Sequence, residues 1–502
     1  MNVIPLFVAI PLAAAFFIPM VSQKFRWVPD LLGNLTAFAL LVMAVSVIGK
    51  KDVYIMGGWA PPIGINLVLD GLSVLMLITI SLVGFTATLF SIRYMEQYTS
   101  KLRYYSLFLL MMGGMNGVAL SGDMFNIFVF LEIASVASYA LVGFGCEHEE
   151  LEASFKYLVL GSVASTLILL GVAVIYGSLG SLNMAHVSRL IVEQGMNKAL
   201  YFSLTLLVMG FSLKAALVPF HAWLPDAHPS APAPISAMLS GVLIKVLGVY
   251  ALLRISFNVF GMSPLLANIL IWLGTISMVV GGLLALGQWD YKRLLAYSSI
   301  SQVGYVVLAV GIGGAVISRG DSMAVAGLAI GGGLFHLINH AAFKSLLFLS
   351  SGAIVYSTGT RDLRKMGGLK DRMPLTSGAA NIGAFSISGI PPFNGFWSKL
   401  VIIIAAVQAR YYWLALTAVL ISVITLAYYL KLQRHAFFGP ASENNRDVRE
   451  VPLSMCIPMV LLAVLCVGMG LLLLPGPRAE ILQPAVDALT MGMKYATVIL
   501  GR

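Results

Sequence analysis

The sequence predicts an all-α membrane protein with about fourteen transmembrane helices. Hydrophobic residues make up 59% of the 502 residues and charged residues only 10%, whereas a soluble domain carries about 25% charged residues. The apolar residues form long unbroken runs, each near the roughly 20 residues that a helix needs to cross a bilayer. Because the runs lack the alternation of barrel strands, helices are the remaining way to satisfy every backbone polar group in lipid.

The predicted spans follow one another along the whole chain, and no large polar domain separates them. A weaker amphipathic segment, at about residues 478–500, follows the last span. We predict spans over residues 3–22, 27–48, 69–93, 104–122, 124–145, 157–179, 199–219, 232–255, 264–287, 291–316, 324–350, 376–410, 411–434 and 452–475, of which the twelfth is interrupted.

The lysines and arginines of the loops predict the orientation in the membrane. Most of these basic residues follow odd-numbered spans, and basic loops face the cytoplasm. The strongest marker is the cluster Arg361, Arg364, Lys365, Lys370 and Arg372. Because the span number is even, we expect both termini outside. The net charge of +10 follows from this loop bias, so it does not indicate nucleic-acid binding.

Proline interrupts two of the predicted spans, the seventh and the twelfth. Pro219 and Pro225 break LKAALVPFHAWLPDAHPSAPAP, and Pro391 and Pro392 break SISGIPPFNGFWSK. Such breaks free backbone carbonyls at membrane depth, and they are tolerated only inside protein or beside a water-filled cavity. Paired broken helices, one in each half of a chain, are typical of inverted repeats around an ion path. The alternative is an ordinary proline kink in each helix.

The predicted repeats divide the chain into four parts. Residues 1–103 form the first three helices, and residues 104–255 form the first inverted repeat, with helices 4–8. Residues 256–434 form the second inverted repeat, with helices 9–13. Residues 435–502 contain the fourteenth helix and the amphipathic segment, so the two repeats occupy the middle of the chain.

One carboxylate lies inside an apolar span, whereas every other acidic residue falls in a loop or at a span end. Glu132 follows Asp123 by about 13 Å of helix, which places it near the middle of a hydrocarbon core of about 30 Å. Lys214 lies inside another span. Burial disfavours a charged lysine and a nearby carboxylate favours it, so we predict that Glu132 modulates the protonation of Lys214. The alternative is a static ion pair that orders the bundle.

Three more lysines and two histidines lie within predicted spans. The segment GGGLFHLINHAAFKSLLFL places His336, His340 and Lys344 four residues apart on one helix face. Water-bridged titratable groups at this spacing are typical of a proton wire, and satisfied polar core residues are the alternative. In chain order, Lys245 lies between the predicted Glu–Lys pair and this segment, and Lys399 follows the second break. We expect Lys399 to be the terminal acceptor.

Three further titratable residues, His221, Asp226 and His228, flank the first break. We predict either that they line the cytoplasmic mouth of the path or that they satisfy the freed backbone groups. The chain has no HExxH segment, no phosphate-binding or dinucleotide-binding loop and no cysteine motif for a metal cluster. We therefore expect no metal and no cofactor, and we expect an ion gradient or a partner subunit to drive transport.

Several long stretches together resemble one family of membrane subunits. The similarity covers roughly residues 60–440, and the chain resembles the antiporter-like subunits shared by respiratory complex I, Mrp-type sodium/proton antiporters and membrane-bound hydrogenases. The stretch around Glu132 looks most like the Mrp-D type of these subunits. The matching stretches are GDMFNIFVFLEIASVASY, the text of residues 213–250, DYKRLLAYSSISQVGY, HLINHAAFKSLLFLSSG, GTRDLRKMGGL and SGIPPFNGFWSK.

The resemblance implies the fourteen-helix fold with inverted repeats at helices 4–8 and 9–13. It also implies that Glu132 and Lys214 are the family's coupling pair and that Lys245 is its connecting residue. The two histidines and the lysine on one helix face then form the central axis, and Lys399 is the terminal lysine. The resemblance further implies a multisubunit complex.

We therefore expect a proton-translocating subunit of a Mrp-type cation/proton antiporter or of a redox-driven Mrp, hydrogenase or complex I-related assembly. Its expected location is the plasma membrane of a prokaryote. The expected partners are other membrane subunits, the lipid bilayer, protons and, in an antiporter, Na⁺. Any redox activity would belong to partner subunits, because this chain carries no cofactor motif. The alternative is a scaffold subunit of the same type of complex that conducts no ions.

Overall fold

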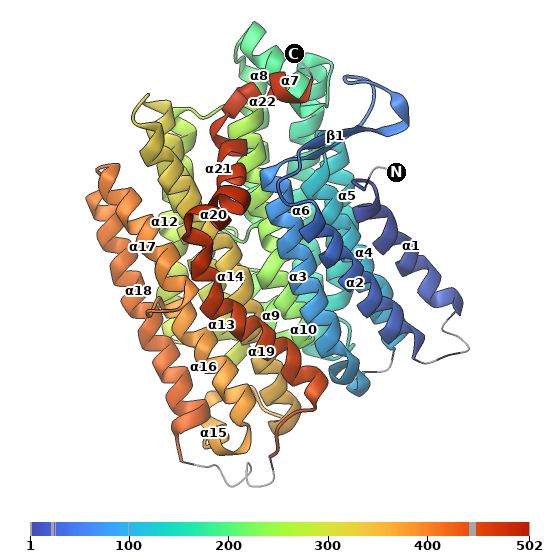
Figure 1. Ribbon diagram of the computed structural model, residues 1–502, viewed down its shortest axis with the longest axis vertical. Coiled ribbons are helices and arrows are strands. Elements are labelled where there is room, and N and C mark those ends of the chain that lie inside the picture. The colour runs from blue at the N-terminus through green and yellow to red at the C-terminus, as the bar shows by residue number, and fades with distance from the viewer. Residues whose placement is uncertain (1–2, 22–24, 26, 99, 441–447, 501–502) are drawn as a thin grey trace.

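The computed structural model describes residues 3–21, 25, 27–98, 100–440 and 448–500. Its helices lie roughly side by side along the vertical axis, and the first and last helices both reach toward the upper end (Figure 1). The first half of the chain contains α1 (Leu6–Val21), α2 (Val28–Ser46), α3 (Gly71–Tyr94), α4 (Lys101–Leu120), α5 (Met124–Val142), α6 (His148–Leu179), α7 (Met184–Gln194), α8 (Lys198–Lys214), α9 (Leu224–Ser230) and α10 (Ala233–Met238).

Helix α10 is the first part of a long helix, and the second half of the chain begins after that helix. That helix continues as a π-helix from Leu239 to Tyr250 and ends at Val259. The helices that follow are α12 (Pro264–Leu286), α13 (Tyr291–Ser318), α14 (Met323–Thr358), α15 (Leu369–Arg372), α16 (Pro374–Ser388), α17 (Asn394–Gln408), α18 (Tyr412–Gln433) and α19 (Leu453–Gly468).

The last part of the chain runs back toward the upper end over the bundle (Figure 1). It consists of the short helices α20 (Pro475–Pro477), α21 (Gln483–Thr490) and α22 (Tyr495–Ile499). Helix α21 packs against α3 and α14, so the amphipathic segment predicted at 478–500 covers the bundle instead of extending it.

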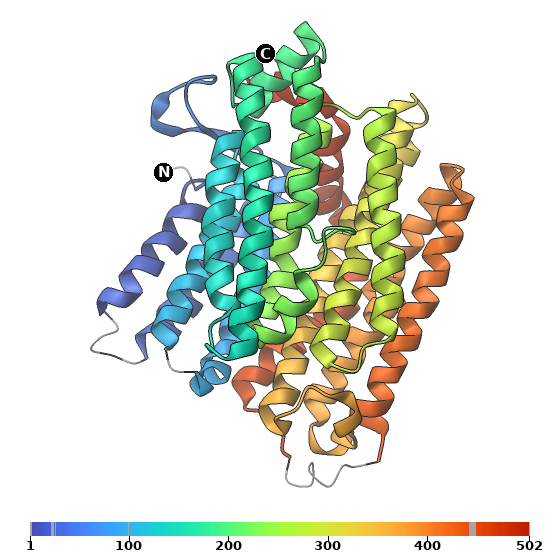
Figure 2. The ribbon, with the colours of Figure 1, turned by 180° about the vertical axis from the view of Figure 1, so that it is seen from behind.

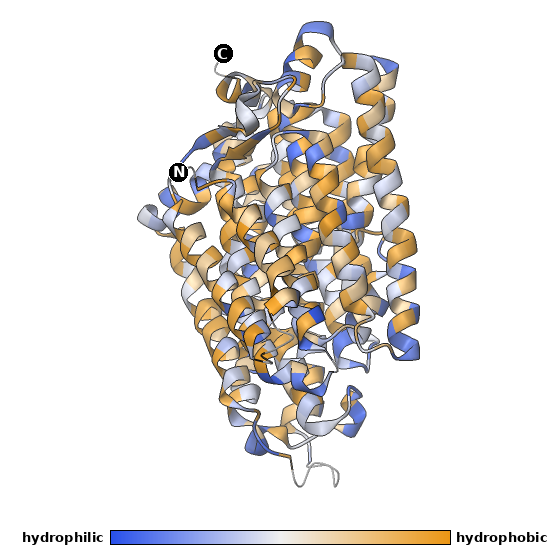
Figure 3. Ribbon diagram, turned by 90° about the vertical axis from the view of Figure 1, so that its right-hand side faces the viewer, coloured by the Kyte–Doolittle hydropathy of each residue, from blue (hydrophilic) through white to orange (hydrophobic). Residues whose placement is uncertain are grey.

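The protein is a multi-pass α-helical membrane protein, as the sequence predicts. In the described part of the chain, ten helices are long and apolar enough to cross a membrane, and α1 and α17 are shorter apolar helices. Figure 3 shows apolar residues along the middle of the bundle and most of the hydrophilic ones toward its two ends. This distribution is the one expected of a protein whose middle contacts hydrocarbon.

A short β-hairpin departs from the all-α prediction. Strand β1 (Asp52–Ile55) pairs antiparallel with β2 (Asn66–Leu69), between α2 and α3. The fully buried Asn66 side chain accepts a hydrogen bond from Asn183 Nδ2 at 2.9 Å, which ties the hairpin to the start of α7. A search for long apolar runs cannot find the hairpin, because each strand has only four residues.

Both spans predicted to be broken are interrupted in the structure. Helix α8 ends at Lys214 and α9 begins at Leu224, and Figure 2 shows the unwound chain between them near mid-height of the bundle. Helix α16 ends at Ser388 and α17 begins at Asn394. The first break is closed by protein partners, since Trp223 Nε1 donates to the Leu213 carbonyl at 3.1 Å.

A buried ion pair joins three parts of the chain near the upper end. Arg254, 1% exposed, donates from Nη2 to Asp70 Oδ1 at 2.5 Å. The guanidinium also lies 5.6 Å from the ring centre of Tyr495 in α22. Asp70 in turn accepts from the Ser73 amide at 2.9 Å and so caps α3. The pair therefore connects α3, the helix that ends at Val259 and the C-terminal segment.

We predict that Arg254→Met lowers stability by about 3–5 kcal/mol, because it leaves a buried carboxylate without its counter-charge. The double variant Arg254→Met with Asp70→Asn should recover most of the loss, since it removes both charges and keeps an oxygen at the cap. Arg319→Gln, in an exposed pair with Asp321, is the control and should change little. Thermal unfolding in detergent measures all three, and a neutral Arg254→Met would contradict the prediction.

Candidate functional site

The predicted Glu–Lys pair meets between α5 and α8. Lys214 Nζ lies 3.7 Å from Glu132 Oε1, which is ion-pair distance but longer than a normal hydrogen bond. The ammonium donates instead to Ser135 Oγ at 2.9 Å and to Tyr139 OH at 3.2 Å. Glu132 accepts a hydrogen bond from the Ser165 hydroxyl of α6. Each member of the pair therefore has other partners, and a small displacement separates them.

Lys245 is fully buried in the π-helix that follows α10. Its Nζ donates to the carbonyls of Ser240 at 2.5 Å and of Gly241 at 2.6 Å, in its own helix. The close approach of this helix to α14 depends on Gly241, because a Cβ at that position would collide with Ser345 Oγ. Lys245 therefore lies on a helix that packs directly against Ser345, the residue after Lys344.

The three residues predicted on one face of α14 are all fully buried. Lys344 Nζ donates to the Leu295 carbonyl at 2.7 Å and to the Ser298 hydroxyl, both on α13. The His336 and His340 rings lie parallel at 6.4 Å between centres. Helix α14 thus carries three titratable side chains through the centre of the second half of the bundle.

The two histidines of α14 differ in their partners. His336 Nε2 is hydrogen-bonded to Gln302 Oε1 at 3.2 Å, and His336 Nδ1 is hydrogen-bonded to the Ser398 hydroxyl at 2.9 Å. Neither ring nitrogen of His340 has a hydrogen-bond partner among the described residues. A buried imidazole without protein partners needs water or a transferred proton to be satisfied. His340 is therefore the position of α14 best suited to a water-bridged proton.

Lys399 lies beside the second break, five residues into α17. Its Nζ donates to the carbonyl of Ile387 at 2.8 Å, which is a backbone group at the unwound end of α16. The same ammonium lies 5.1 Å from the ring centre of Tyr305. The break at Pro391 and Pro392 thus supplies the carbonyl that solvates this lysine in place of water.

The buried cations outnumber the carboxylates that could neutralise them. Among the described lysines with buried side chains, only Lys214 lies within ion-pair distance of a carboxylate. Within the same described residues, Lys245, Lys344 and Lys399 have only carbonyl, hydroxyl and ring partners. An uncompensated ammonium in a low-dielectric interior costs several kcal/mol, and neighbouring ammonium groups repel one another. A proton on one of these lysines therefore disfavours a proton on a neighbouring one.

The three residues predicted at the cytoplasmic mouth lie in different surroundings. His221 is half-buried, and Asp226 forms exposed ion pairs with Lys156 and Arg293, each at 3.1 Å. His228 is fully buried, and its ring centre lies 4.6 Å from that of Phe348 in α14. Hence only Asp226 and His221 can meet bulk water, whereas His228 belongs to the interior.

Comparison with known sequences places the chain in a family. A model described as NADH:quinone oxidoreductase/Mrp antiporter, transmembrane, matches residues 121–425, and one described as the N-terminus of chain 5 of complex I matches residues 60–105. The chain belongs to the NADH:quinone oxidoreductase/Mrp antiporter family. It is thus an antiporter-like membrane subunit, and the resemblance stated from its motifs is confirmed.

Full-length relatives support this assignment. The antiporter-like subunit is 34% identical to the N-type subunit of the NADH-quinone oxidoreductase of Desulforudis audaxviator, over 93% of this chain and 94% of the relative. It is also 34% identical to the D-type subunit of the Na(+)/H(+) antiporter of Alkalihalophilus pseudofirmus, over 87% and 88%. One polypeptide in the structure of the Mrp complex from Dietzia sp. superposes with a TM-score of 0.90 at 30% identity, covering 99% of both chains.

One buried lysine of the antiporter-like subunit has no signal in the sequence. Lys292, in the first turn of α13, stands at the end of the span predicted over residues 291–316, where a lysine normally reaches the membrane surface, but only 3% of it is exposed. The adjacent Arg293 points outward to Asp226. A Lys–Arg pair at the start of a helix does not indicate which of the two faces inward, because packing against neighbouring helices decides it.

We predict that Lys245→Met leaves the stability unchanged or raises it. The substitution replaces a buried ammonium that has no counter-charge with an apolar side chain of similar length, and such replacements are often neutral or stabilising. The effect is measured by heating the purified complex and monitoring the temperature at which this subunit is lost from the assembly. A fall of many degrees would instead make Lys245 a structural residue, and Ser345→Ala provides a neighbouring control.

Proposed function

We propose that the antiporter-like subunit moves protons through its interior along a chain of buried lysines and histidines. The observation that carries the proposal is the set of ammonium groups without counter-charges, because proteins retain intramembrane ionisable groups chiefly where these groups move ions. The proposed path comprises Glu132, Lys214, Lys245, His336, His340, Lys344 and Lys399.

The Glu132–Lys214 pair would act as the switch of this path. While Glu132 is close, its charge favours a proton on Lys214. When the two separate, burial disfavours the ammonium, and the proton leaves toward Lys245. Repulsion between neighbouring ammonium groups then passes the charge onward to α14 and finally to Lys399. The 3.7 Å separation and the alternative hydroxyl partners of both residues suit a contact that opens and closes.

The mouth on the predicted cytoplasmic side would be formed by His221 and Asp226, with His228 behind them as an inner relay. Asp226 lies where two cations already gather, Lys156 and Arg293. Asp226 is 30% exposed, so a path that begins beside it can be reached from water. His228 is too deeply buried to exchange protons with bulk water directly.

We propose a topology of fourteen spans, in which helices 4–8 and 9–13 form two inverted repeats. The ten long apolar helices, together with α1, α4, α8 with α9, and α16 with α17, make up this number. An internal correspondence supports the repeats. Asp123, before α5, forms an isolated bridge with Asn183 after α6, and Asp290, before α13, forms one with Asp362 after α14. The proposed repeats are residues 104–255 and 256–434.

A partner subunit is proposed to cover the outer face of α5. Glu132 remains 33% exposed although it lies at membrane depth. The side chains of Phe125, Val129 and Val136 continue the same stripe of the helix and are exposed as well. Lipid would leave the carboxylate unsatisfied, whereas another membrane subunit can cover both it and the apolar stripe. A multisubunit Mrp-type antiporter or a redox-driven relative in a prokaryotic plasma membrane fits this surface.

The orientation that we propose places both termini outside. The segment at the lower end of the bundle in Figure 1 contains the short helix α15 and the basic residues that precede it. We call this end the basic face, defined by residues 361–372, and we assign it to the cytoplasm because basic loops are retained there.

We predict that Lys214→Met lowers proton transport at least about tenfold, because the path then lacks its switch, and acid–base groups typically contribute factors of about a hundred or more. Vesicles that hold the whole complex are assayed for proton and Na⁺ transport, and a native gel verifies assembly. Lys198→Met, which removes an exposed lysine at the start of the same helix, is the matched control and should transport normally.

Normal transport by the assembled Lys214→Met complex would contradict the proposal and would leave this chain as a scaffold. Glu132→Gln should give the same loss as Lys214→Met, since each removes one member of the pair. If Na⁺ movement persists while proton movement stops, the Na⁺ path lies in another subunit. Loss of both together indicates that proton transport through this subunit is coupled to Na⁺ transport.

A further inference from the structure

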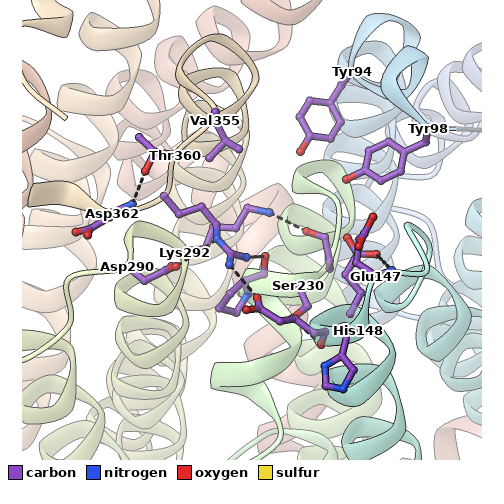
Figure 4. Close-up of a pocket in the computed structure, with 16 residues that line it drawn as sticks. Tyr94, Tyr98, Glu147, His148, Ser230, Asp290, Lys292, Val355, Thr360 and Asp362 are labelled. Atoms are coloured by element: carbon purple, nitrogen blue, oxygen red, sulfur yellow. Dashed lines mark hydrogen bonds and ion pairs between the residues drawn. The ribbon is translucent and has the colours of Figure 1, made fainter. Parts of the chain in front are cut away.

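A polar cavity of about 660 Å³ opens at the basic face, where segments of both halves of the chain meet. Its walls come from the end of α3, the start of α6, the linker before α10, the start of α13 and the end of α14. Figure 4 shows Lys292 between the side that carries Asp290 and Asp362 and the side that carries Glu147 and Tyr98. The cavity thus brings charged groups of both halves around one lysine.

Three of the carboxylates around this cavity are held by cations other than Lys292. Arg361 pairs with Glu149 at 3.2 Å and with Asp290 at 3.3 Å, across the cavity. Arg364 binds Asp362 at 3.0 Å, and this hydrogen bond keeps the pKa of the Asp362 carboxyl below its ordinary value. These three carboxylates form a network of paired charges, whereas Glu147 and Glu150, which also line the cavity, pair with no cation among the described residues.

Lys292 differs from every other charged residue of the cavity. Although it lines the cavity, only 3% of it is exposed, and its Nζ donates to the Ala231 carbonyl at 2.7 Å. Among the described residues this is its one hydrogen bond, and no carboxylate lies within ion-pair distance. An ammonium can donate three hydrogen bonds, so two remain for water in the cavity. The side chain stands at the boundary between the wet cavity and the dry interior.

The interior side of Lys292 leads to the buried titratable groups. Ala231, its acceptor, follows His228 by three residues in the linker between α9 and α10. His228 is fully buried, neither of its ring nitrogens has a partner among the described residues, and its electrostatic neighbours include both Lys292 and Lys344. His228 is therefore a buried titratable group within electrostatic range of the cavity lysine, and its ring contacts α14 at Phe348, 4.6 Å between ring centres.

We propose that Lys292 is the proton-loading residue of the antiporter-like subunit, taking protons from the cavity on the basic face and passing them to His228. This inference rests on the proton path proposed above. A hydronium ion in the cavity protonates the neutral Lys292 amine and leaves as water. The ammonium then gives its proton to the neutral His228 imidazole and returns to the amine, and His228 passes the proton to the Lys344 amine.

The charged and titratable groups that face Lys292 decide how protons reach it. The carboxylates of Glu147 and Glu150, which pair with no cation among the described residues, raise the local concentration of cations, hydronium included. Arg361 opposes a permanent charge on Lys292, which favours release of the proton inward. The groups that face Lys292 are Tyr94 at the end of α3, Tyr98 after it, Glu147, His148, Glu149 and Glu150 at the start of α6, His228 of α9, Asp290 before α13, and Arg361 and Asp362 after α14.

The test uses vesicles with the complete complex and compares Lys292→Met, Lys292→Arg and Lys365→Met. Arginine keeps the charge and can still donate to the Ala231 carbonyl, but it cannot release its proton. We expect both Lys292 variants to lose at least about tenfold in proton transport. Lys365→Met removes an exposed lysine of the same face and should transport normally.

Wild-type transport by an assembled Lys292→Arg complex would overturn the inference, because only a structural lysine can be replaced by a fixed charge. This variant also decides the question if Lys292→Met fails to assemble. Lys214→Met is measured in parallel. If it is inactive while a Lys292 variant is fully active, only the loading role fails, whereas activity in all the variants would refute the proton path itself.

Discussion

The cost of keeping ammonium groups inside a membrane is the constraint on which the rest of this structure depends. Lys214, Lys245, Lys344 and Lys399 lie in the interior, and among the described residues one carboxylate, Glu132, lies within ion-pair distance of any of them. Because their charges are not balanced, a proton on one lysine disfavours a proton on the next, and on the proposed path the lysines share protons instead of holding one each. An arrangement that is unfavourable as a static core is suitable for transport, since every proton that enters the chain of lysines displaces another.

The backbone irregularities of the fold supply what water would otherwise supply. The end of α16 offers a carbonyl to Lys399, and the π-helix offers two to Lys245. By contrast, Arg254 has a close counter-charge in Asp70, which suits a fixed connection between helices. Paired charges thus hold parts of the molecule together, whereas the unpaired charges lie along the proposed proton path.

Much of this structure could be predicted from the sequence because lipid leaves few alternatives. Long apolar runs must be helices, and a lysine in the middle of one stands out through its cost, as with Lys245. The signal fails at the ends of helices. Lys292 stands at the end of a predicted span, where a lysine is normally exposed, and only the packing of α13 buries it. The sequence likewise does not indicate the hairpin whose first strand is Asp52–Ile55, because short strands leave no apolar run.

The central claim is that Glu132 controls whether Lys214 carries a proton. Nitrogen-15 NMR of labelled lysine in the membrane-embedded complex, with the Lys214 signal assigned by its loss in Lys214→Met, reports directly whether this side chain is an ammonium or an amine. We predict an ammonium signal in the wild type that shifts toward the amine in Glu132→Gln at the same pH. An unchanged ammonium signal in Glu132→Gln would contradict the claim, because Lys214 would then hold its proton without the carboxylate.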